Sequence, residues 1–180
     1  MEAGQRGGGL GAVTNAVPRG MLTAFTESEP VMLDLVLAIL HHLVILSLAG
    51  LLAAELVLIK PGVSGTGLKA LGLTDAGYGV TAGLILAVGF SRVFFGAKGS
   101  AFYLENPVFW AKIAAFAVVG ALSAWPTLAI LKWRGRAKAD PAFAAPAGEV
   151  AKVRRVLILE LLVFARIPIF AAAMARGYGL

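Results

Sequence analysis

The sequence predicts an all-α fold, a polytopic four-helix transmembrane bundle, and three observations support this prediction. The 180-residue chain is 59% hydrophobic and 14% charged, whereas soluble domains contain about 45–50% apolar and about 25% charged residues. Four apolar stretches are each long enough to cross a bilayer, which takes about 20 helical residues. The sequence shows none of the alternating strands of about ten residues that build a closed membrane barrel.

The first two helices are expected at about residues 33–59 and 76–95, where the chain is almost continuously apolar. The first stretch ends at a lysine, a proline and a glycine, residues 60–62. The second ends at the sequence Gly-Ala-Lys-Gly, residues 96–99. Because proline and glycine disfavour the continuation of a helix, both segments mark helix ends.

The third and fourth helices are expected at about residues 107–131 and 155–177. Asn106 is a favourable N-cap residue, and Pro107 suits the first turn of the third helix. The third apolar stretch ends where the basic residues begin, at Lys132. Two prolines inside these helices should produce kinks: Pro126 and Pro168.

The chain is expected to divide into a flexible N-terminal tail, residues 1–30, and a four-helix membrane domain, residues 31–180. The tail is rich in glycine and other small residues and shows no apolar periodicity, which is typical of disordered segments. It also lacks the compact hydrophobic region of a cleaved signal peptide.

Lysine and arginine counts predict which loops face the cytoplasm. Nine basic residues lie near the two loops that follow the first and third helices: Lys60, Lys69, Lys132, Arg134, Arg136, Lys138, Lys152, Arg154 and Arg155. Five lie on the other side: Arg6, Arg19, Arg92, Lys98 and Arg176. Since cytoplasmic loops carry the excess positive charge, both termini are expected outside. The basic cluster is typical of a loop at a membrane surface, so the expected partner is the lipid bilayer and not nucleic acid.

Ionisable side chains interrupt each apolar stretch, and such residues inside a bilayer tend to mark function. With a rise of about 1.5 Å per residue, His41 and His42 lie about 7 Å outward of the midpoint of the first helix. Arg92 lies about 9 Å outward in the second helix, and Lys112 about 10 Å outward in the third. We therefore expect these four side chains to form one pocket in the outer half of the bundle.

The two adjacent histidines point to different faces of their helix. His41 shares a face with Asp34 and Glu55, and this polar face should point into the bundle because lipid cannot solvate it. His42 points about 100° away, toward Ala49 and Ala53. Small residues four apart let membrane helices approach closely. We expect such pairs to be used within the bundle or in a homodimer: Ala49 and Ala53, Gly79 and Gly83, and Gly120 and Ala124.

Haem b or another porphyrin is one candidate ligand for this pocket. Neutral imidazole is a common axial ligand of haem iron, and Arg92 and Lys112 could pair with the propionates. We expect His42 to be the metal ligand and His41 to be a hydrogen-bond or proton partner. Because the adjacent histidines cannot clamp one iron, the second ligand would be Met32, Met174, water or a histidine of another subunit.

Other interpretations remain open. A small transporter could use a proton relay made of Asp34, His41, Glu55 and Glu160. A purely structural role would pair Glu55 with Lys60 and Glu160 with Arg155, and the protein would then be a non-enzymatic accessory or scaffold subunit of a larger membrane complex. The chain contains no cysteine, which excludes disulfides, zinc–thiolate sites, iron–sulfur clusters and thiol catalysis. The sequence identifies no catalytic residue and leaves open whether the protein is an enzyme.

Seven separated motifs resemble one family of membrane proteins. They are residues 40–43 (LHHL), 51–56 (LLAAEL), 75–79 (DAGYG), 96–103 (GAKGSAFY), 106–112 (NPVFWAK), 122–127 (LSAWPT) and 174–177 (MARG). Together they resemble the predicted bacterial inner-membrane proteins of domain of unknown function 2214, over about residues 31–178. This resemblance implies four helices and a bacterial inner membrane, and it carries over no activity.

A looser resemblance concerns the architecture and the placement of histidine, arginine and lysine on the first three helices. In these features the chain is similar to the haem-containing bacterial membrane protoporphyrinogen oxidase and to copper-resistance membrane proteins. The similarity implies haem as a candidate cofactor. The residues that would carry it are His41 or His42, Arg92 and Lys112.

Overall fold

The computed structural model describes the backbone of residues 19–179 and the side chains of residues 32–179. These residues form six helices: α1 (Arg19–Leu58), α2 (Gly65–Phe95), α3 (Gly99–Leu104), α4 (Pro107–Ala139), α5 (Ala147–Phe164) and α6 (Arg166–Ala175). Four helical segments are long and apolar enough to cross a membrane, with α5 and α6 together forming the fourth. The predicted all-α fold with four transmembrane helices is therefore confirmed.

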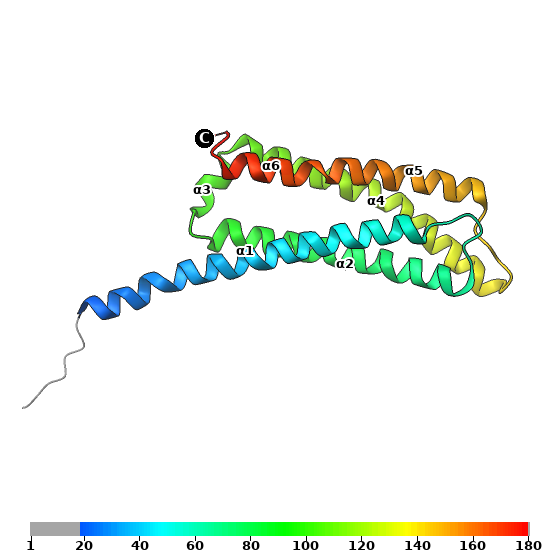
Figure 1. The fold of residues 1–180 in the computed structure, drawn as a ribbon, viewed down its shortest axis with the longest axis horizontal. Helices are drawn as coiled ribbons and strands as arrows, with labels where there is room; N and C mark the ends of the chain where they lie inside the picture. Colours follow the sequence, from blue (N-terminus) through cyan, green and yellow to red (C-terminus); the bar gives the residue numbers. More distant parts are fainter. Residues whose placement is uncertain (1–18, 180) are drawn as a thin grey trace, which may run out of the picture.

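The helices form an elongated antiparallel bundle (Figure 1). α1 packs mainly against α2, while α4 packs against α5 and α6, and α2 joins the two pairs by packing against α4. α1 touches α5 but makes no close backbone approach to α6 within the described segments. The connections α1–α2 and α4–α5 lie together at one end, which we call the loop end; α3 and α6 lie at the other, the α3 end (Figure 1).

α2 begins at Gly65, well before the expected start at residue 76. Its added turns bury Leu68, Leu71 and Asp75, which lie three or four residues apart on the same helical face as the buried Tyr78. Polar and glycine residues lower the mean hydropathy of this segment, so a search for continuous apolar runs misses its helical spacing. The sequence had placed Lys69 in the preceding loop, but Lys69 belongs to α2.

The helices that flank the other loop are also longer at the loop end than predicted. α4 continues past residue 131 to Ala139 and completely buries Trp133, whose indole Nε1 donates a 2.7 Å hydrogen bond to Glu149. α5 begins at Ala147 instead of about residue 155. The buried residues of α5 repeat at intervals of three and four: Val150, Val153, Leu157, Glu160 and Phe164.

α1 begins at Arg19, earlier than the expected start at about residue 33. The proposed flexible tail, residues 1–30, therefore overlaps α1 from residue 19 onward. Its remaining part, residues 1–18, lies outside the described residues.

Only one of the two expected proline kinks interrupts a helix. α4 runs continuously through Pro126, whereas the fourth span divides at Ala165 into α5 and α6. Pro168 explains the division, because its ring clashes with the carbonyl of the residue four positions earlier. The Arg166 guanidinium donates a hydrogen bond to the carbonyl of Leu162 at this break, so Arg166 satisfies a backbone group and does not line a cavity.

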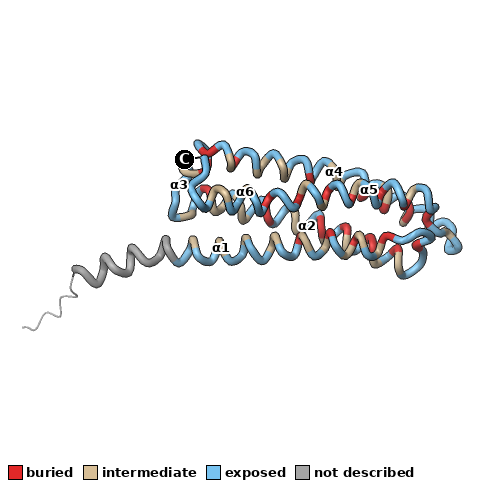
Figure 2. Tube along the Cα trace, turned by 45° about the horizontal axis from the view of Figure 1, so that its top comes forward, coloured by how far each residue is buried: buried red, intermediate tan, exposed pale blue. Residues whose placement is uncertain are grey.

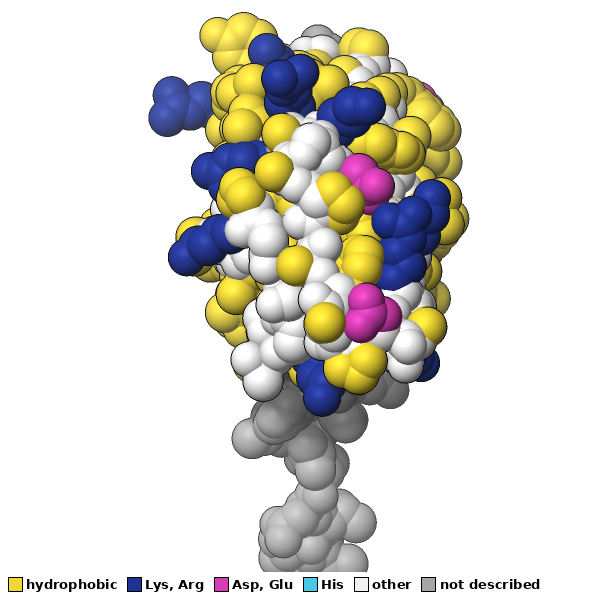
Figure 3. All heavy atoms as spheres, turned by 90° about the vertical axis from the view of Figure 1, so that its right-hand side faces the viewer, with side chains coloured by type: hydrophobic (Ala, Val, Ile, Leu, Met, Phe, Trp, Pro, Cys, Tyr) yellow, Lys and Arg dark blue, Asp and Glu magenta, His cyan; other side chains and the backbone are white. Residues whose placement is uncertain are grey.

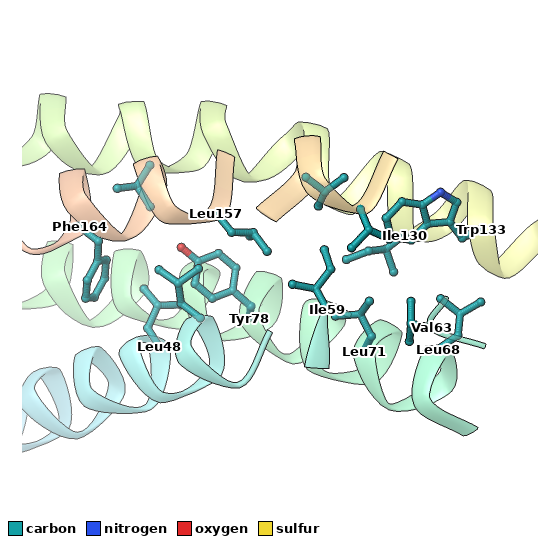
Figure 4. Close-up of a cluster of buried hydrophobic side chains, with 14 of the residues drawn as sticks. Leu48, Ile59, Val63, Leu68, Leu71, Tyr78, Ile130, Trp133, Leu157 and Phe164 are labelled. Carbon is teal, nitrogen blue, oxygen red and sulfur yellow. The ribbon is translucent and has the colours of Figure 1, made fainter. Parts of the chain in front are cut away.

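The apolar core lies mainly in the half of the bundle near the loop end, where buried positions gather in Figure 2. Figure 4 shows its side chains converging from α1, α2, α4 and α5. The two loops also pair with each other, since the Gly62 N–H donates to the Ala145 carbonyl and the Ala145 N–H to the Val63 carbonyl. Gly62 adopts a φ of 74° in this turn, a conformation that glycine accepts readily.

The loop end is basic, with lysine and arginine side chains spread around its margin (Figure 3). This agrees with the charge distribution that underlies the predicted orientation. The structure contains no membrane, so the side on which this end lies stays a prediction.

The small-residue pairs do not pack as expected. Gly79 and Gly83 on α2 and Gly120 on α4 are exposed, and no other part of the described chain comes within 4 Å of a Cβ placed there. Ala53 is also exposed, although its neighbour Ala49 packs against the core. The expected intramolecular use of these pairs is therefore wrong, because the helices approach one another through faces bearing larger side chains.

Candidate functional site

Five basic or imidazole side chains meet in a cavity of about 230 Å³ at the α3 end. We call this site the basic cavity and define it by His41 and His42 of α1, Arg92 of α2, Lys98, and Lys112 of α4. Phe102 and Tyr103 of α3 and Met174 of α6 also line it. The structure thus brings together all four residues that the sequence assigned to a pocket, and it adds Lys98.

The inward face of α1 places His41 at the cavity. His41 lies seven residues before the completely buried Leu48 and fourteen before the buried Glu55, so the three share one face. Gly89 of α2 lies beside the imidazole, and a Cβ there would be 3.5 Å from His41 Cε1. The absence of a side chain at residue 89 therefore keeps the space beside His41 open.

Arg92 has one carboxylate near it. Its Nη2 lies 3.9 Å from Asp34 Oδ1, and both side chains are about one-quarter exposed. Gly96 permits this approach, since a Cβ there would lie 2.9 Å from Asp34 Oδ1.

Aromatic rings support the two lysines. Lys98 Nζ lies 4.5 Å from the ring centre of Phe102, and Lys112 Nζ lies 5.2 Å from that of Phe109. Such cation–π contacts hold a cation without neutralising it. Burial raises the pKa of the Tyr103 phenol, against the opposing effect of Arg92, so Tyr103 supplies a neutral hydroxyl at the cavity wall.

Two nitrogen atoms at the cavity are buried without a hydrogen-bond partner among the described residues, Arg92 Nε and His41 Nδ1. Buried polar groups are normally hydrogen-bonded, and leaving one unsatisfied costs about 1–3 kcal/mol. The cations Arg92, Lys98 and Lys112 give the cavity more positive charge than Asp34 compensates.

The two histidines have different surroundings. Their ring centres are 6.3 Å apart and their planes are inclined by 80°. His42 is exposed, and its Nδ1 lies 2.6 Å from the Ala38 carbonyl. Because a carbonyl can only accept, Nδ1 of His42 carries the proton and Nε2 remains free to accept a hydrogen bond or bind a metal.

A second polar group lies deeper in the bundle and is acidic. We call it the carboxyl cluster: Glu55 of α1, Asp75 of α2 and Glu160 of α5, all buried and within electrostatic range of one another. Thr127 Oγ1 donates a 2.6 Å hydrogen bond to Asp75 Oδ1. The Tyr78 hydroxyl points across the bundle toward α5 (Figure 4).

No ion pair in the described part of the chain joins the carboxyl cluster to a cation, although Arg134 lies within electrostatic range of Asp75. Glu160 is completely buried, and neither of its carboxyl oxygens makes a hydrogen bond of ordinary geometry there, although the Tyr78 hydroxyl is close enough to interact with it. The expected pairs of Glu55 with Lys60 and of Glu160 with Arg155 do not occur among the described ion pairs. The longer α2 explains the composition of this cluster, because it carries Asp75 away from the helix start and into the bundle.

The proposed proton relay is divided between these two sites. Asp34 and His41 belong to the basic cavity region, whereas Glu55 lies fourteen residues further along α1, about 21 Å away along the helix axis. The completely buried Leu48 and Leu52 occupy the same face between them. A continuous relay through these residues is therefore not formed.

Two members of these sites were not predicted from the sequence, Lys98 and Asp75. Lys98 lies beyond the expected end of the second helix, and the short α3 that follows returns it to the cavity. Asp75 lies just before, and Tyr78 just after, residue 76, where the sequence predicted the start of the second helix. The spacing from Leu68 to Tyr78 on one helical face would have extended that helix and placed both in the interior.

In the described residues, no group of three or more histidine, cysteine, aspartate or glutamate side chains could hold a metal ion.

Comparisons with known proteins identify a family but no function. No curated protein and no solved structure matches the chain. The family model for predicted membrane proteins, DUF2214, matches residues 33–179. This match covers most of α1 and all of α2 to α6, and the chain belongs to the DUF2214 family of predicted membrane proteins.

Proposed function

We propose that this membrane protein binds an anionic ligand bearing a phosphate or carboxylate group in the basic cavity. The observation that carries the proposal is the convergence of Arg92, Lys98 and Lys112 on one cavity with His41. Asp34 is the only carboxylate within ion-pairing distance of these cations in the described residues. Charge-assisted hydrogen bonds from arginine and lysine are the strong interactions by which proteins hold such anions.

The size of the cavity favours a compact charged group. Pockets for drug-sized ligands measure about 300–1,000 Å³, and the basic cavity measures about 230 Å³. A phosphate or carboxylate group fits this volume with room for ordered water. Arg92 Nε and His41 Nδ1 are donors or acceptors that such a group, or its water, would satisfy.

Haem b is the second candidate, and one observation favours it. Met174 lines the same cavity as His41 and His42, so a histidine and a methionine face one space, as in the axial ligation of some cytochromes. His42 Nε2 would be the metal-binding atom, and Arg92 and Lys112 would hold the propionates. The cavity is small for a porphyrin, so this ligand requires α6 to move away from α1. A purified protein with a Soret band that is lost in His42→Ala would establish it; a colourless protein from haem-supplied cells would exclude it.

The test of anion binding uses the detergent-purified protein and native mass spectrometry. Wild-type protein should retain a phosphate-bearing adduct after mild desolvation, and the variants Arg92→Gln and Lys112→Met should each retain at least fivefold less. Lys69→Gln is the matched control, because Lys69 is an exposed cation at the opposite end of the bundle. Equal retention by all four proteins would contradict the proposal.

We propose a bacterial inner membrane as the location, with the loop end in the cytoplasm and both termini outside. The basic margin of the loop end supports this orientation, because positive residues are retained on the cytoplasmic side (Figure 3). Reporter fusions after residues 68 and 140 should be active in the cytoplasm, and fusions after 100 and 180 outside. The inverse pattern would place the basic cavity in the inner half of the membrane.

A non-enzymatic accessory subunit is a further interpretation, and it is favoured by the exposed small-residue faces. Gly79 and Gly83 leave a flat, open strip on α2, where a second copy or another membrane helix could pack closely. Co-purification of a partner that is lost in Gly83→Leu would support this function. Retention of the partner by that variant would exclude this surface.

A further inference from the structure

We propose that the ligand is an anionic membrane lipid whose head group occupies the basic cavity and whose acyl chain lies in an adjoining apolar groove. This inference rests on the proposed anion binding and names the class of ligand. A second, smaller cavity of about 60 Å³ provides the groove. Its apolar walls come from four helices, α1, α2, α4 and α6: Ile45, Ile85, Leu86, Phe90, Phe116 and Ile167.

The groove and the basic cavity adjoin. Both are lined by His41 and Lys112, and both are lined by Gly89, Val93 and Phe109. The polar side chains therefore stand at the junction of the two spaces. A ligand that fills both must carry its charge at one end and an apolar chain at the other.

The groove lies deeper in the membrane than the cavity on each of three helices. Ile45 follows His41 by four residues on α1, and Phe116 follows Lys112 by four residues on α4. On the antiparallel α2, Ile85 precedes Gly89 by four residues. Four residues correspond to about 6 Å along a helix, and all three steps lead toward the centre of the bundle. This is the direction in which an acyl chain runs from its head group.

The groove opens to the surface that faces lipid. Leu86 and Phe90 line it and are 41% and 48% exposed. A chain can therefore enter sideways from the bilayer without crossing the bundle. Every membrane lipid can bring an acyl chain to the groove, so burial of the chain adds affinity over that of a free anion but does not select among lipids. Selection must come from the head group, where the excess of basic side chains favours an anion over a zwitterion.

Three probes distinguish this proposal from binding of a free anion. Detergent-purified protein is titrated with dioleoylphosphatidylglycerol, with dioleoylphosphatidylcholine, and with glycerol phosphate, and adducts are counted by native mass spectrometry. The phosphatidylglycerol should bind at least tenfold more tightly than either of the others. Glycerol phosphate that binds as tightly as phosphatidylglycerol would leave anion binding intact and overturn the lipid assignment. Failure of both anions to bind would overturn the proposed function itself.

Two variants test the groove separately from the cavity. Gly89→Leu should lower the affinity for phosphatidylglycerol at least fivefold by filling the junction, and Leu86→Trp should do so by blocking the exposed mouth. Gly83→Leu is the matched control, because Gly83 lies on the same helix with open space around it. Because Leu86 is half-exposed, its variant tests the groove even if Gly89→Leu fails to fold. Unchanged affinity in folded Leu86→Trp protein, or an equal loss in Gly83→Leu, would overturn the groove.

Discussion

The basic cavity and the carboxyl cluster are both polar, yet they differ in what surrounds them. The cavity holds cations and imidazoles around open space at the α3 end. The cluster holds Glu55, Asp75 and Glu160 in the packed interior, among completely buried leucines and next to Tyr78. Open space beside unsatisfied donors is what a ligand needs, whereas a packed interior leaves no room for one. The difference supports the proposal that the first region binds a ligand, and it leaves no room for one in the second.

The largest expected effect is on lipid retention, which should depend on the basic cavity and not on the carboxyl cluster. The double variant Arg92→Gln/Lys112→Met should lose more than tenfold of the bound anionic lipid, since each charged hydrogen bond contributes about 1.5–3 kcal/mol. The double variant Glu55→Gln/Glu160→Gln should retain it fully. Native mass spectrometry of both purified proteins makes the comparison. Loss of the lipid from the carboxamide variant would mean that the two regions act as one site.

The next effect is on the free energy of unfolding, which should change in opposite directions when Glu160 and Asp75 of the carboxyl cluster are replaced. Glu160→Met should raise the free energy of unfolding by about 1–3 kcal/mol, because it removes two buried oxygens that lack partners in the described residues. Asp75→Leu should lower it by about 1 kcal/mol, because Asp75 accepts the hydrogen bond of Thr127. Thermal unfolding in detergent measures both. A Glu160→Met protein that is less stable than wild type would show that this carboxyl group has a partner or function of its own.

The smallest effect concerns the one carboxylate beside the cavity. Asp34 competes with an anionic ligand for Arg92, at 3.9 Å and in a partly exposed position. Ion pairs of this kind contribute about 0.2–1 kcal/mol, so Asp34→Asn should raise the affinity for phosphatidylglycerol by about two- to fivefold. Competition titrations against wild type detect this change. A lower affinity would mean that Asp34 positions Arg92 for the ligand and does not compete with it.

The sequence was sufficient to predict the four spans and four of the five side chains that define the basic cavity. Apolar length locates a membrane helix whatever packs against it, and the rise per residue places His41, Arg92 and Lys112 at one depth. The ends of the helices were harder to predict because they are amphipathic, and only the spacing of residues such as Val150, Val153 and Leu157 reveals them.

The partners of individual side chains could not be predicted from the sequence. Asp34 of α1 and Arg92 of α2 are far apart in the sequence, and only the fold shows that they lie beside each other. Lys98 was assigned to a loop, and its place in the cavity depends on α3, a helix of six residues. The prolines behaved differently as well, since α4 continues through Pro126 while the fourth span divides before Pro168. Such outcomes depend on neighbouring helices and not on the local sequence.

The most direct test of lipid binding is an experimental structure of the protein in a lipid phase that contains phosphatidylglycerol with brominated acyl chains. We predict the phosphate within hydrogen-bonding distance of Arg92 and Lys112, about 3 Å, and anomalous bromine density in the groove beside Gly89. Density for the phosphate and bromine only on the outer surface of the bundle, with water in the basic cavity, would contradict the account.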